Sequence, residues 1–445
     1  MTARPTPALD DTVELLRELV RAACVNDGAP GSGQEVRGVR VLQRFLADEI
    51  AGGRIDTHVF ESAPGRSSLV ARVRGTDPAA PALGLIGHLD VVPVSPEHWL
   101  RDPFAADLID GEIWGRGTVD MLYLTAAFAA VAREVARAED RPRGDLVLLA
   151  VADEEGGSEY GLKWLLREHP DAVRVTEAIS ETGGMRMGEH VAIDVAEKGS
   201  AGRRLVVRGT PGHASIPYGA HSAAVRAGEV LQRLAEVEPA IELGELWRPF
   251  IEARIDDRAL AERLLDPVRI DAALPELGGI AGYAHAVSRI TISPTVLRSG
   301  QTHNVIPDEA LIDLDIRTLP GTSDEQVDGL LREMLGDLAD TVEIRHLHGW
   351  PATASPSDHP LFAAVCRAIE ATDGSPVVPL MAAGGSDARL MRLIGIPAYG
   401  FGLLTKGWTY ERYRERIHAH NERIDIESVA LTLEALRRLV ADRIG

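Results

Sequence analysis

Residues 83–120 decide the fold, and they read LGLIGHLDVVPVSPEHWLRDPFAADLIDGEIWGRGTVD. The apolar run that begins at Leu83 is short enough for a buried strand, and His88 and Asp90 follow at its end. Asp120 comes after a glycine-containing turn and opens an apolar stretch with helical spacing. Zn²⁺ accepts histidine nitrogen and carboxylate oxygen readily, so one interpretation is a metal site. The alternative is a buried, hydrogen-bonded His88 and a helix cap at Asp120.

The composition indicates a globular protein with more than one core. The chain has 445 residues, of which 45% are hydrophobic and 26% charged, and a chain of this length usually divides into two domains. The formal net charge of −20 argues against nucleic acid or an anionic membrane as a partner. The two cysteines, Cys24 and Cys366, lie in helical patterns and suit core positions in a reducing compartment.

The sequence lacks the usual signals for secretion and for membrane insertion. Residues 1–20 contain no apolar central segment and carry acidic residues early, so no signal peptide is expected. No run reaches the ~18 apolar residues of a membrane span. We therefore expect a cytoplasmic protein.

Hydrophobic periodicity predicts an α/β fold with a mostly parallel sheet in the first and last parts of the chain. Helices are expected at 8–24, 35–50, 359–371, 386–394 and 426–442 and directly after Asp120, and strands at 55–60, 68–74, 83–87, 146–152, 176–182 and 396–402. Alternating buried strands and helices are typical of such a sheet with helices packed on it.

The middle of the chain follows a different order of elements. A strand, a helix, two strands, a helix and a strand are expected at 202–208, 221–235, 287–298, 309–317, 323–336 and 341–347. This order is that of a ferredoxin-like unit. A charged, helix-compatible segment at about 240–284 interrupts it, as an insertion on this smaller domain. The expected division is therefore 1–197 and 349–445 for the first domain, with 198–348 inserted into it.

Carboxylates and a histidine follow further predicted strands. Glu154 and Glu155 come after one strand, Glu181 ends the next, and His418 lies before the last helix. In open α/β sheets, ligands bind at the carboxyl ends of the strands. These side chains could hold two divalent ions about 3.5–4 Å apart, with a spare glutamate as general base. The alternatives are a solvated acidic turn and an ordinary histidine.

Nine short motifs occur in a fixed order over residues 83–425. They are GHLDVVP, W-x3-PF, GRGTVDM, DEEGG, SETGG, GTPGHAS-x-P, NVIPDEA with DIRTLPG, AGGSDAR and HAHNE. In this order they resemble the di-zinc amidohydrolases and exopeptidases that include aminoacylase, glutamate carboxypeptidase, acetylornithine deacetylase and succinyl-diaminopimelate desuccinylase. One motif would carry little weight, whereas nine in order are specific.

The resemblance implies a site for two divalent ions, with zinc expected and cobalt or manganese as alternatives. The implied metal ligands are His88, Asp120, Glu155, Glu181 and His418, with Asp120 bridging. Glu154 would be the general base, and Asp90 would orient His88. His418 is preferred to His420, because the family's ligand lies four residues before the glutamate of HAHNE. The peptide bond between Asp120 and Met121 would be cis.

The resemblance also implies the substrate contacts. His213 would stabilise the oxyanion from the lid, Asn304 and Arg317 would bind the substrate, and Gly384 and Gly385 would form a loop near its carboxylate. From the sequence alone, GHAS could merely turn the chain after a strand, and Arg317 could be a surface residue.

Relatives of this kind pair through the inserted domain. A homodimer through residues 199–240 and 285–320 is therefore expected, with His213 and Asn304 acting in the partner's site. The segment 240–284 leaves an alternative, in which it covers the pairing edge and His213 acts within its own chain.

The implied activity is hydrolysis of an amide bond in N-acyl amino acids or short peptides that carry a free carboxylate. The attacking group would be a metal-activated water. A dipeptidase or a biosynthetic deacylase is an alternative within the same chemistry. The alternative of a different class is a non-catalytic binding protein that shares the fold.

Overall fold

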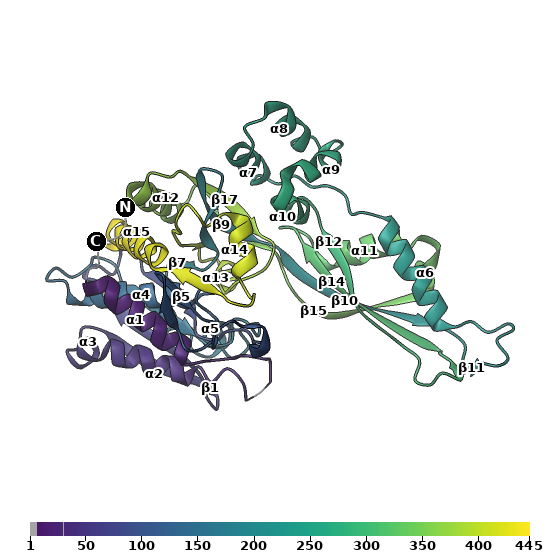
Figure 1. Ribbon diagram of the computed structural model, residues 1–445, viewed down its shortest axis with the longest axis horizontal. Coiled ribbons are helices and arrows are strands. Elements are labelled where there is room, and N and C mark those ends of the chain that lie inside the picture. The colour runs from purple at the N-terminus through teal and green to yellow at the C-terminus, as the bar shows by residue number, and fades with distance from the viewer. Residues whose placement is uncertain (1–6, 30) are drawn as a thin grey trace.

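The computed structural model describes residues 7–29 and 31–445, which form two lobes (Figure 1). The larger lobe contains the first and last parts of the chain, and the smaller lobe, here called the lid, contains the middle part. Residues 1–6, on which part of the signal-peptide expectation rests, lie outside the described residues. No helix in the described ranges is long and apolar enough to cross a membrane.

A six-stranded sheet forms the centre of the larger lobe, in the order β1-β2-β6-β3-β7-β18. Its strands are β1 Asp56–Ala63, β2 Arg66–Val73, β6 Leu146–Val151, β3 Leu83–His88, β7 Glu177–Ser180 and β18 Ala398–Gly400. The strands from β6 to β18 run parallel, whereas β1 and β2 pair antiparallel. The expected α/β fold is confirmed, and the carboxyl ends of β3, β6 and β7 share one edge.

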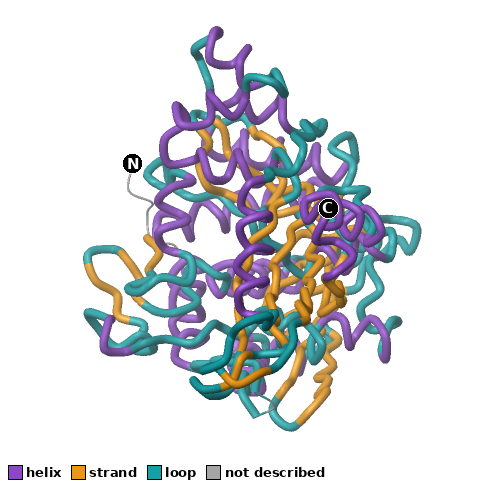
Figure 2. Tube along the Cα trace, turned by 90° about the vertical axis from the view of Figure 1, so that its right-hand side faces the viewer, coloured by secondary structure: helices purple, strands orange, loops and turns teal. Residues whose placement is uncertain are grey.

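Helices cover both faces of this sheet. Alternate residues of β6 point to opposite sides, so that Leu148 packs with one set of helices and Leu149 with the other. The first set is α1 Pro7–Arg21, α4 Leu122–Arg137 and α15 Ile426–Ile444, and the second is α5 Leu162–Glu168 and α13 Ala388–Leu393. Figure 2 views the whole molecule from the lid end, with strands of both lobes near its middle and helices around them.

A second sheet in the larger lobe was absent from the sequence-based expectation. It contains β16 Thr353–Ala354, β9 His190–Glu197 and β17 Val377–Ala382, with β8 Gly183–Met187 paired to β9. The helices α12 Pro360–Asp373 and α14 Tyr410–Arg416 also belong to this lobe. Strand β9 leads directly into the lid, so this sheet connects the two lobes.

The lid contains a four-stranded antiparallel sheet in the order β12-β14-β10-β15. Its strands are β10 Gly199–Arg208, β12 Thr291–Ser299, β14 Glu309–Thr318 and β15 Val342–Trp350, and its helices are α6 Ala223–Glu236 and α11 Asp324–Leu335. Every second residue of β14 is buried, and the apolar ones among them share a core with the two helices. The order of elements is the ferredoxin-like one.

The strands by which the chain enters and finally leaves the lid lie side by side. On the larger-lobe side Thr353 pairs with Glu197, and on the lid side Trp350 pairs with Ser200. Lys198 lies between these pairs and is fully buried. Its Nζ donates hydrogen bonds to the backbone carbonyls of Ala286 and Arg289, in the segment that enters β12.

The segment at 240–284 folds as a group of short helices. They are α7 Trp247–Arg254, α8 Arg258–Leu264, α9 Ile270–Ala273 and α10 Ala281–Val287, with a 3₁₀ helix, η2 Leu274–Ile280, before α10. Although it lies within the lid in sequence, its apolar side chains join the core of the larger lobe. The Tyr283 hydroxyl donates a hydrogen bond of 3.1 Å to the carbonyl of Met381 in β17.

Two expected helices differ in their bounds. Helix α1 ends at Arg21, so the placement of Cys24 in a helix was wrong; Ala23 has a φ of 48°, which a right-handed helix cannot accommodate. The helix expected at 35–50 consists of α2 Val36–Phe45 and α3 Ala47–Ala51. Cys366 lies in α12 as expected.

Candidate metal centre

The implied metal ligands converge at the carboxyl edge of the main sheet. His88 is the last residue of β3, Glu155 follows β6, and Glu181 follows β7. Asp120 lies just before α4, and His418 arrives from the loop after α14. Segments from both ends of the chain therefore build the same site.

Asp120 lies between the two histidines. Its Oδ1 is 3.1 Å from His88 Nε2, and its Oδ2 is 2.9 Å from His418 Nε2. Glu181 Oε2 is 3.5 Å from His88 Nε2, and Glu155 Oε1 is 3.3 Å from His418 Nε2. Two tetrahedral ligands at about 2.0–2.1 Å from zinc are separated by about 3.3 Å. The four distances are compatible with two ion positions that share Asp120.

The hydrogen bonding of His88 suits a metal ligand. Its Nδ1 lies 2.8 Å from the backbone carbonyl of Asp90, and because a carbonyl only accepts, Nδ1 carries the proton. In neutral imidazole, Nε2 then presents its lone pair to the carboxylates of Asp120 and Glu181. Glu155 Oε1 is buried without a hydrogen-bond partner among the described residues. A bound cation would satisfy both groups.

Negative charge is crowded at this site. Burial, reinforced by the charge of Asp120, raises the pKa of Glu181 to about 8. Burial and the charge of Glu181 raise the pKa of Glu154 well above its usual range. Burial also acts to raise the pKa of Asp120, but the neighbouring His418 and His88 outweigh it and hold this pKa well below its usual range. Buried carboxylates this close together require positive partners.

Backbone geometry marks the same region. Asp153, Thr182 and His418 have φ angles of 66°, 68° and 59°, which residues other than glycine rarely adopt. Each of the three is either a candidate ligand or the neighbour of a candidate site residue. Such conformations concentrate at functional sites. The Asp120–Met121 peptide bond is cis, as the resemblance implied.

Asp90 makes different contacts from those expected. Its carboxylate oxygen Oδ1 is 3.8 Å from His88 Nδ1, so His88 donates to the Asp90 backbone carbonyl instead. The Asp90 carboxylate accepts hydrogen bonds from the backbone N–H groups of Glu154, at 3.1 Å, and Glu155, at 3.2 Å. Its side chain therefore holds the turn that carries both glutamates.

Glu422, the last residue of HAHNE, fixes the loop before Asp120. Its buried carboxylate accepts hydrogen bonds from the backbone N–H groups of Gly117 (3.1 Å), Val119 (2.7 Å) and Asp120 (3.2 Å). Arg116 Nη1 donates to it at 2.7 Å. From the sequence, Glu422 served only to locate His418, although it belongs to the same motif.

The structure brings His418 to the site and leaves His420 outside it. The ring of His420 packs edge-on against His98, with ring centroids 5.1 Å apart. The two histidines are only two positions apart in the sequence. Because the backbone at His418 is left-handed, their side chains lie in different surroundings.

Arg389 is a further site residue that sequence reasoning missed. Its side chain is buried, and its Nη1 lies 3.7 Å from Glu154 Oε1. Its guanidinium lies over the ring of Trp350, 5.0 Å from the centroid. It belongs to the AGGSDAR motif, from which only Gly384 and Gly385 were predicted to be site residues.

The glycine loop and Arg317 lie near this arginine. Gly384 and Gly385 follow β17, and a Cβ added at Gly385 would come into van der Waals contact with Trp350 and Arg389. Arg317 lies over the same tryptophan ring, at 5.8 Å, but donates to both carboxylate oxygens of Asp315, at 2.7 and 2.9 Å.

His213 and Asn304 lie together at the tip of the lid. Strand β11 Gly212–His213 pairs with β13 Val305–Ile306, and the N–H of Ala214 donates to the carbonyl of Asn304 at 3.0 Å. Figure 1 places β11 at the end of the lid that is farthest from the larger lobe. Within one chain, these two residues are not brought to the metal ligands.

Comparison with known proteins assigns the family. Residues 84–442 match peptidase family M20/M25/M40. The succinyl-diaminopimelate desuccinylase of Wolinella succinogenes is 28% identical over 384 residues, which cover 81% of this chain and 83% of that protein. Aminoacylase-1 of Mus musculus is 25% identical over 432 residues, which cover 95% and 93%.

A solved structure has the same fold. The M20 family metallo-carboxypeptidase Sso-CP2 from Sulfolobus solfataricus matches with a TM-score of 0.73 at 18% identity, over 98% of this chain and 99% of that chain. The family match covers most of the chain, including every candidate metal ligand. The protein therefore belongs to peptidase family M20/M25/M40 and is an enzyme that hydrolyses amide bonds.

Proposed function

We propose that this enzyme is a di-metal hydrolase that cleaves the amide bond of N-acyl amino acids or short peptides with a free carboxylate. The observation that carries the proposal is the position of Asp120 between His88 and His418, with the partly buried Glu154 close to His88. Nitrogen and carboxylate donors of this kind suit zinc, and they also accept cobalt or manganese.

The ligands divide into two groups around Asp120. His88 and Glu181 would hold one ion, and Glu155 and His418 the other, with Asp120 shared by both. When bound, the ions supply a water of lowered pKa and positive charge near the reacting carbonyl. Glu154 would accept the proton of the attacking water and then deliver it to the leaving nitrogen.

The substrate carboxylate would bind on the Arg389 side of Glu154. The guanidinium of Arg389 is buried beside the general base, and a planar guanidinium binds a carboxylate through two parallel hydrogen bonds. In the loop before it, Gly384 has open space where a side chain would lie. Arg317 would contribute only by releasing Asp315, with which it is paired.

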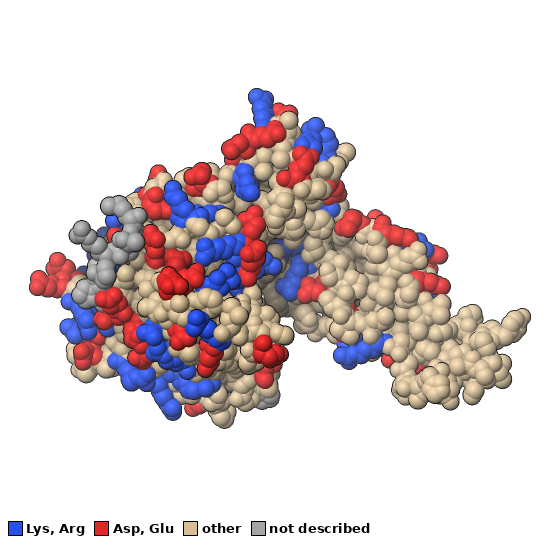
Figure 3. All heavy atoms as spheres, viewed as in Figure 1, with Lys and Arg blue, Asp and Glu red and all other residues tan. Residues whose placement is uncertain are grey.

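We further propose that the lid, residues 198–348, pairs two chains. The tip that carries β11 exposes apolar side chains: Ile216 is 74% exposed, Tyr218 98% and Val305 49%. Figure 3 shows this end of the lid as almost free of charged residues on the face in view. Apolar exposure of this kind is typical of an interface. In a homodimer His213 and Asn304 would serve the partner's site, where His213 would stabilise the oxyanion.

A substrate panel tests the proposed activity. The protein would be stripped with a chelator, reloaded with zinc, cobalt or manganese, and incubated with N-acetyl and N-succinyl amino acids and with dipeptides. We expect hydrolysis in at least one of these classes, lost with the chelator and restored by metal. The class hydrolysed separates an aminoacylase or deacylase from a dipeptidase. Stoichiometric metal binding without hydrolysis of any class would favour a binding protein and contradict the proposal.

A further inference from the structure

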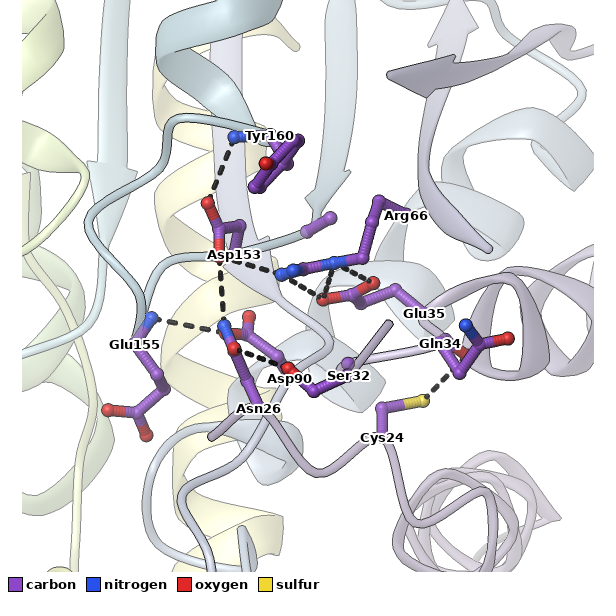
Figure 4. A network of polar contacts seen from close by, with 12 residues as sticks. Cys24, Asn26, Ser32, Gln34, Glu35, Arg66, Asp90, Asp153, Glu155 and Tyr160 are labelled. Atoms are coloured by element: carbon purple, nitrogen blue, oxygen red, sulfur yellow. Dashed lines mark hydrogen bonds and ion pairs between the residues drawn. The ribbon is translucent and has the colours of Figure 1, made fainter. Parts of the chain in front are cut away.

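A buried polar network lies behind the turn that carries Glu154 and Glu155 (Figure 4). It joins Asn26, Glu35 and Arg66 to Asp90 and Asp153, and all five side chains are buried. The first three lie before residue 84, outside the part of the chain that matches the family. None of them is a candidate ligand or base, so their function has to be argued from their contacts.

We propose that Asn26 is a positioning residue, which acts through Asp90 and Asp153 to fix the turn that presents the general base and a metal ligand. This inference rests on the function proposed above. Asn26 Nδ2 donates one hydrogen bond to Asp90 Oδ2 and one to Asp153 Oδ1, both at 2.9 Å. An amide nitrogen has two protons, so both are used on these carboxylates.

The orientation of the Asn26 amide follows from its other contacts. Its Oδ1 accepts a hydrogen bond of 3.1 Å from the backbone N–H of Gly28 and lies 3.2 Å from Ser32 Oγ. If the amide were turned over, its oxygen would face two carboxylates and its NH₂ group would face an N–H donor. The backbone of Asn26 is also fixed, because its N–H donates to the carbonyl of Val91 at 2.9 Å.

The two carboxylates bound by Asn26 hold the turn after β6 from both sides. Asp90 accepts the backbone N–H groups of Glu154 and Glu155. Asp153, which has a left-handed backbone, accepts the N–H of Tyr160 at 2.9 Å with its second oxygen. In Figure 4 the carboxylate of Glu155 points away from the network, so the network fixes its backbone and leaves its side chain free to bind.

Asn26 also separates like charges. Arg66 donates to Glu35 at 2.9 Å and to Asp153 at 2.7 Å, so its single positive charge serves two carboxylates, while Asp90 receives its side-chain hydrogen bond from Asn26 instead. Asn26 is the neutral donor between Asp90 and Asp153. Without it, two buried carboxylates would face each other without a shared proton donor.

The test is Asn26→Asp. This change keeps the size of the side chain but replaces the NH₂ donor between Asp90 and Asp153 with another carboxylate. Substitution of groups that orient metal ligands lowers metal affinity or activity by about 10–100-fold. We expect losses of this size in both the zinc dissociation constant, measured by competition with a chelator, and kcat. KM should stay within about twofold, because the buried Asn26 does not reach the substrate.

A matched control separates positioning from general destabilisation. Asp373→Asn removes the carboxylate partner of the buried Arg186, in a contact of the same lobe that involves none of the site residues. It should lower the melting temperature without changing kcat or zinc affinity. A second variant, Asn26→Ser, keeps one donor and adds no charge, so it should fold and show a smaller loss of both quantities.

The outcomes are distinct. If Asn26→Asp and Asn26→Ser keep wild-type kcat and zinc affinity, or change only in melting temperature as Asp373→Asn does, the inference is overturned. If Asn26→Asp does not fold, Asn26→Ser decides by the same two measurements. If the wild-type enzyme hydrolyses no substrate of the panel, the proposed function fails, whereas the comparison of zinc affinities still tests the inference.

Discussion

Glu154 and Glu155 are neighbours in sequence but face different surroundings. Both lie near His88, but Glu154 also faces Arg389 and Glu181, whereas Glu155 faces Asp120 and His418. We expect Glu154→Gln to retain both ions and to lose about 10²–10⁴-fold in kcat, because an amide cannot accept the proton of water. Glu155→Gln should instead reduce the metal content, measured by elemental analysis per chain. The opposite pattern would mean that the two roles are exchanged.

The two histidines of HAHNE provide a second test at this scale. His418→Ala should lower the metal content toward one ion per chain, because it removes one of three ligands at one position. His420→Ala should leave metal content and kcat unchanged, since that ring packs on His98. If His420→Ala loses metal and His418→Ala does not, the ligand assignment in this loop is wrong.

The sequence identified the residues that the motifs contain and missed those that act through distant partners. His88, Asp120, Glu155, Glu181 and His418 lie in short patterns whose order is specific. Asn26 lies in no motif. Its role can be inferred only from the two carboxylates that the fold places beside it. Arg389 was inside a motif, but nothing in the sequence showed that its side chain would lie next to Glu154.

Lys198 allows a prediction at the scale of the crossing between β9 and β10. Burial, with the nearby positive charge of Arg317, lowers its pKa from 10.5 to about 7. Between these values the unfolded chain binds a proton that the folded chain does not, so the free energy of unfolding rises with pH by up to about 1.4 kcal/mol per unit. The contribution is lost as the pH falls toward 7.

Urea unfolding at pH 7 and pH 9 measures this effect. The difference in unfolding free energy between the wild type and Lys198→Met should grow by about 2 kcal/mol over this interval, in favour of the wild type. The variant removes the titrating group, and effects of other groups cancel in the difference. Equal pH dependence of the two proteins would mean that Lys198 stays protonated in the folded state.

At the same scale, strands and helices with clear periodicity were predicted, and those that depend on distant pairing were missed. Strand β9 contains Asp194 within its apolar run and pairs with β16 and β17, which come much later in the chain. Strand β8 begins with two glycines, which usually weaken a strand. Local patterns cannot show such elements, because their stabilising contacts come from tertiary structure.

Subunit mixing tests the arrangement of the whole molecule. An equal mixture of the inactive variants Glu154→Gln and His213→Ala should regain activity after subunit exchange, because a mixed dimer has one site with both groups intact. Random pairing predicts up to about a quarter of the wild-type activity. If mass spectrometry shows exchange and no activity returns, His213 does not act in the partner's site.

The placement of the segment 240–284 shows what the sequence leaves open at this scale. Its amphipathic helices predict a buried face, but the pattern does not say which core that face joins. In the structure Tyr283 and Phe250 pack together and join the core of the larger lobe. The position of His213 could not be predicted either, since a motif does not give the distance between a residue of the lid and the metal ligands of the larger lobe.

The paired crossings between the lobes have a mechanical consequence. A single linker would let the lid swivel about its own axis as well as bend, whereas two hydrogen-bonded strands form a ribbon that resists twisting. A ribbon bends most readily perpendicular to its plane, and the segment 240–284, which leaves the lid and packs into the core of the larger lobe, adds a second attachment. Because the two attachments act together, we expect the tip of the lid to keep a reproducible position although it lies far from the ribbon.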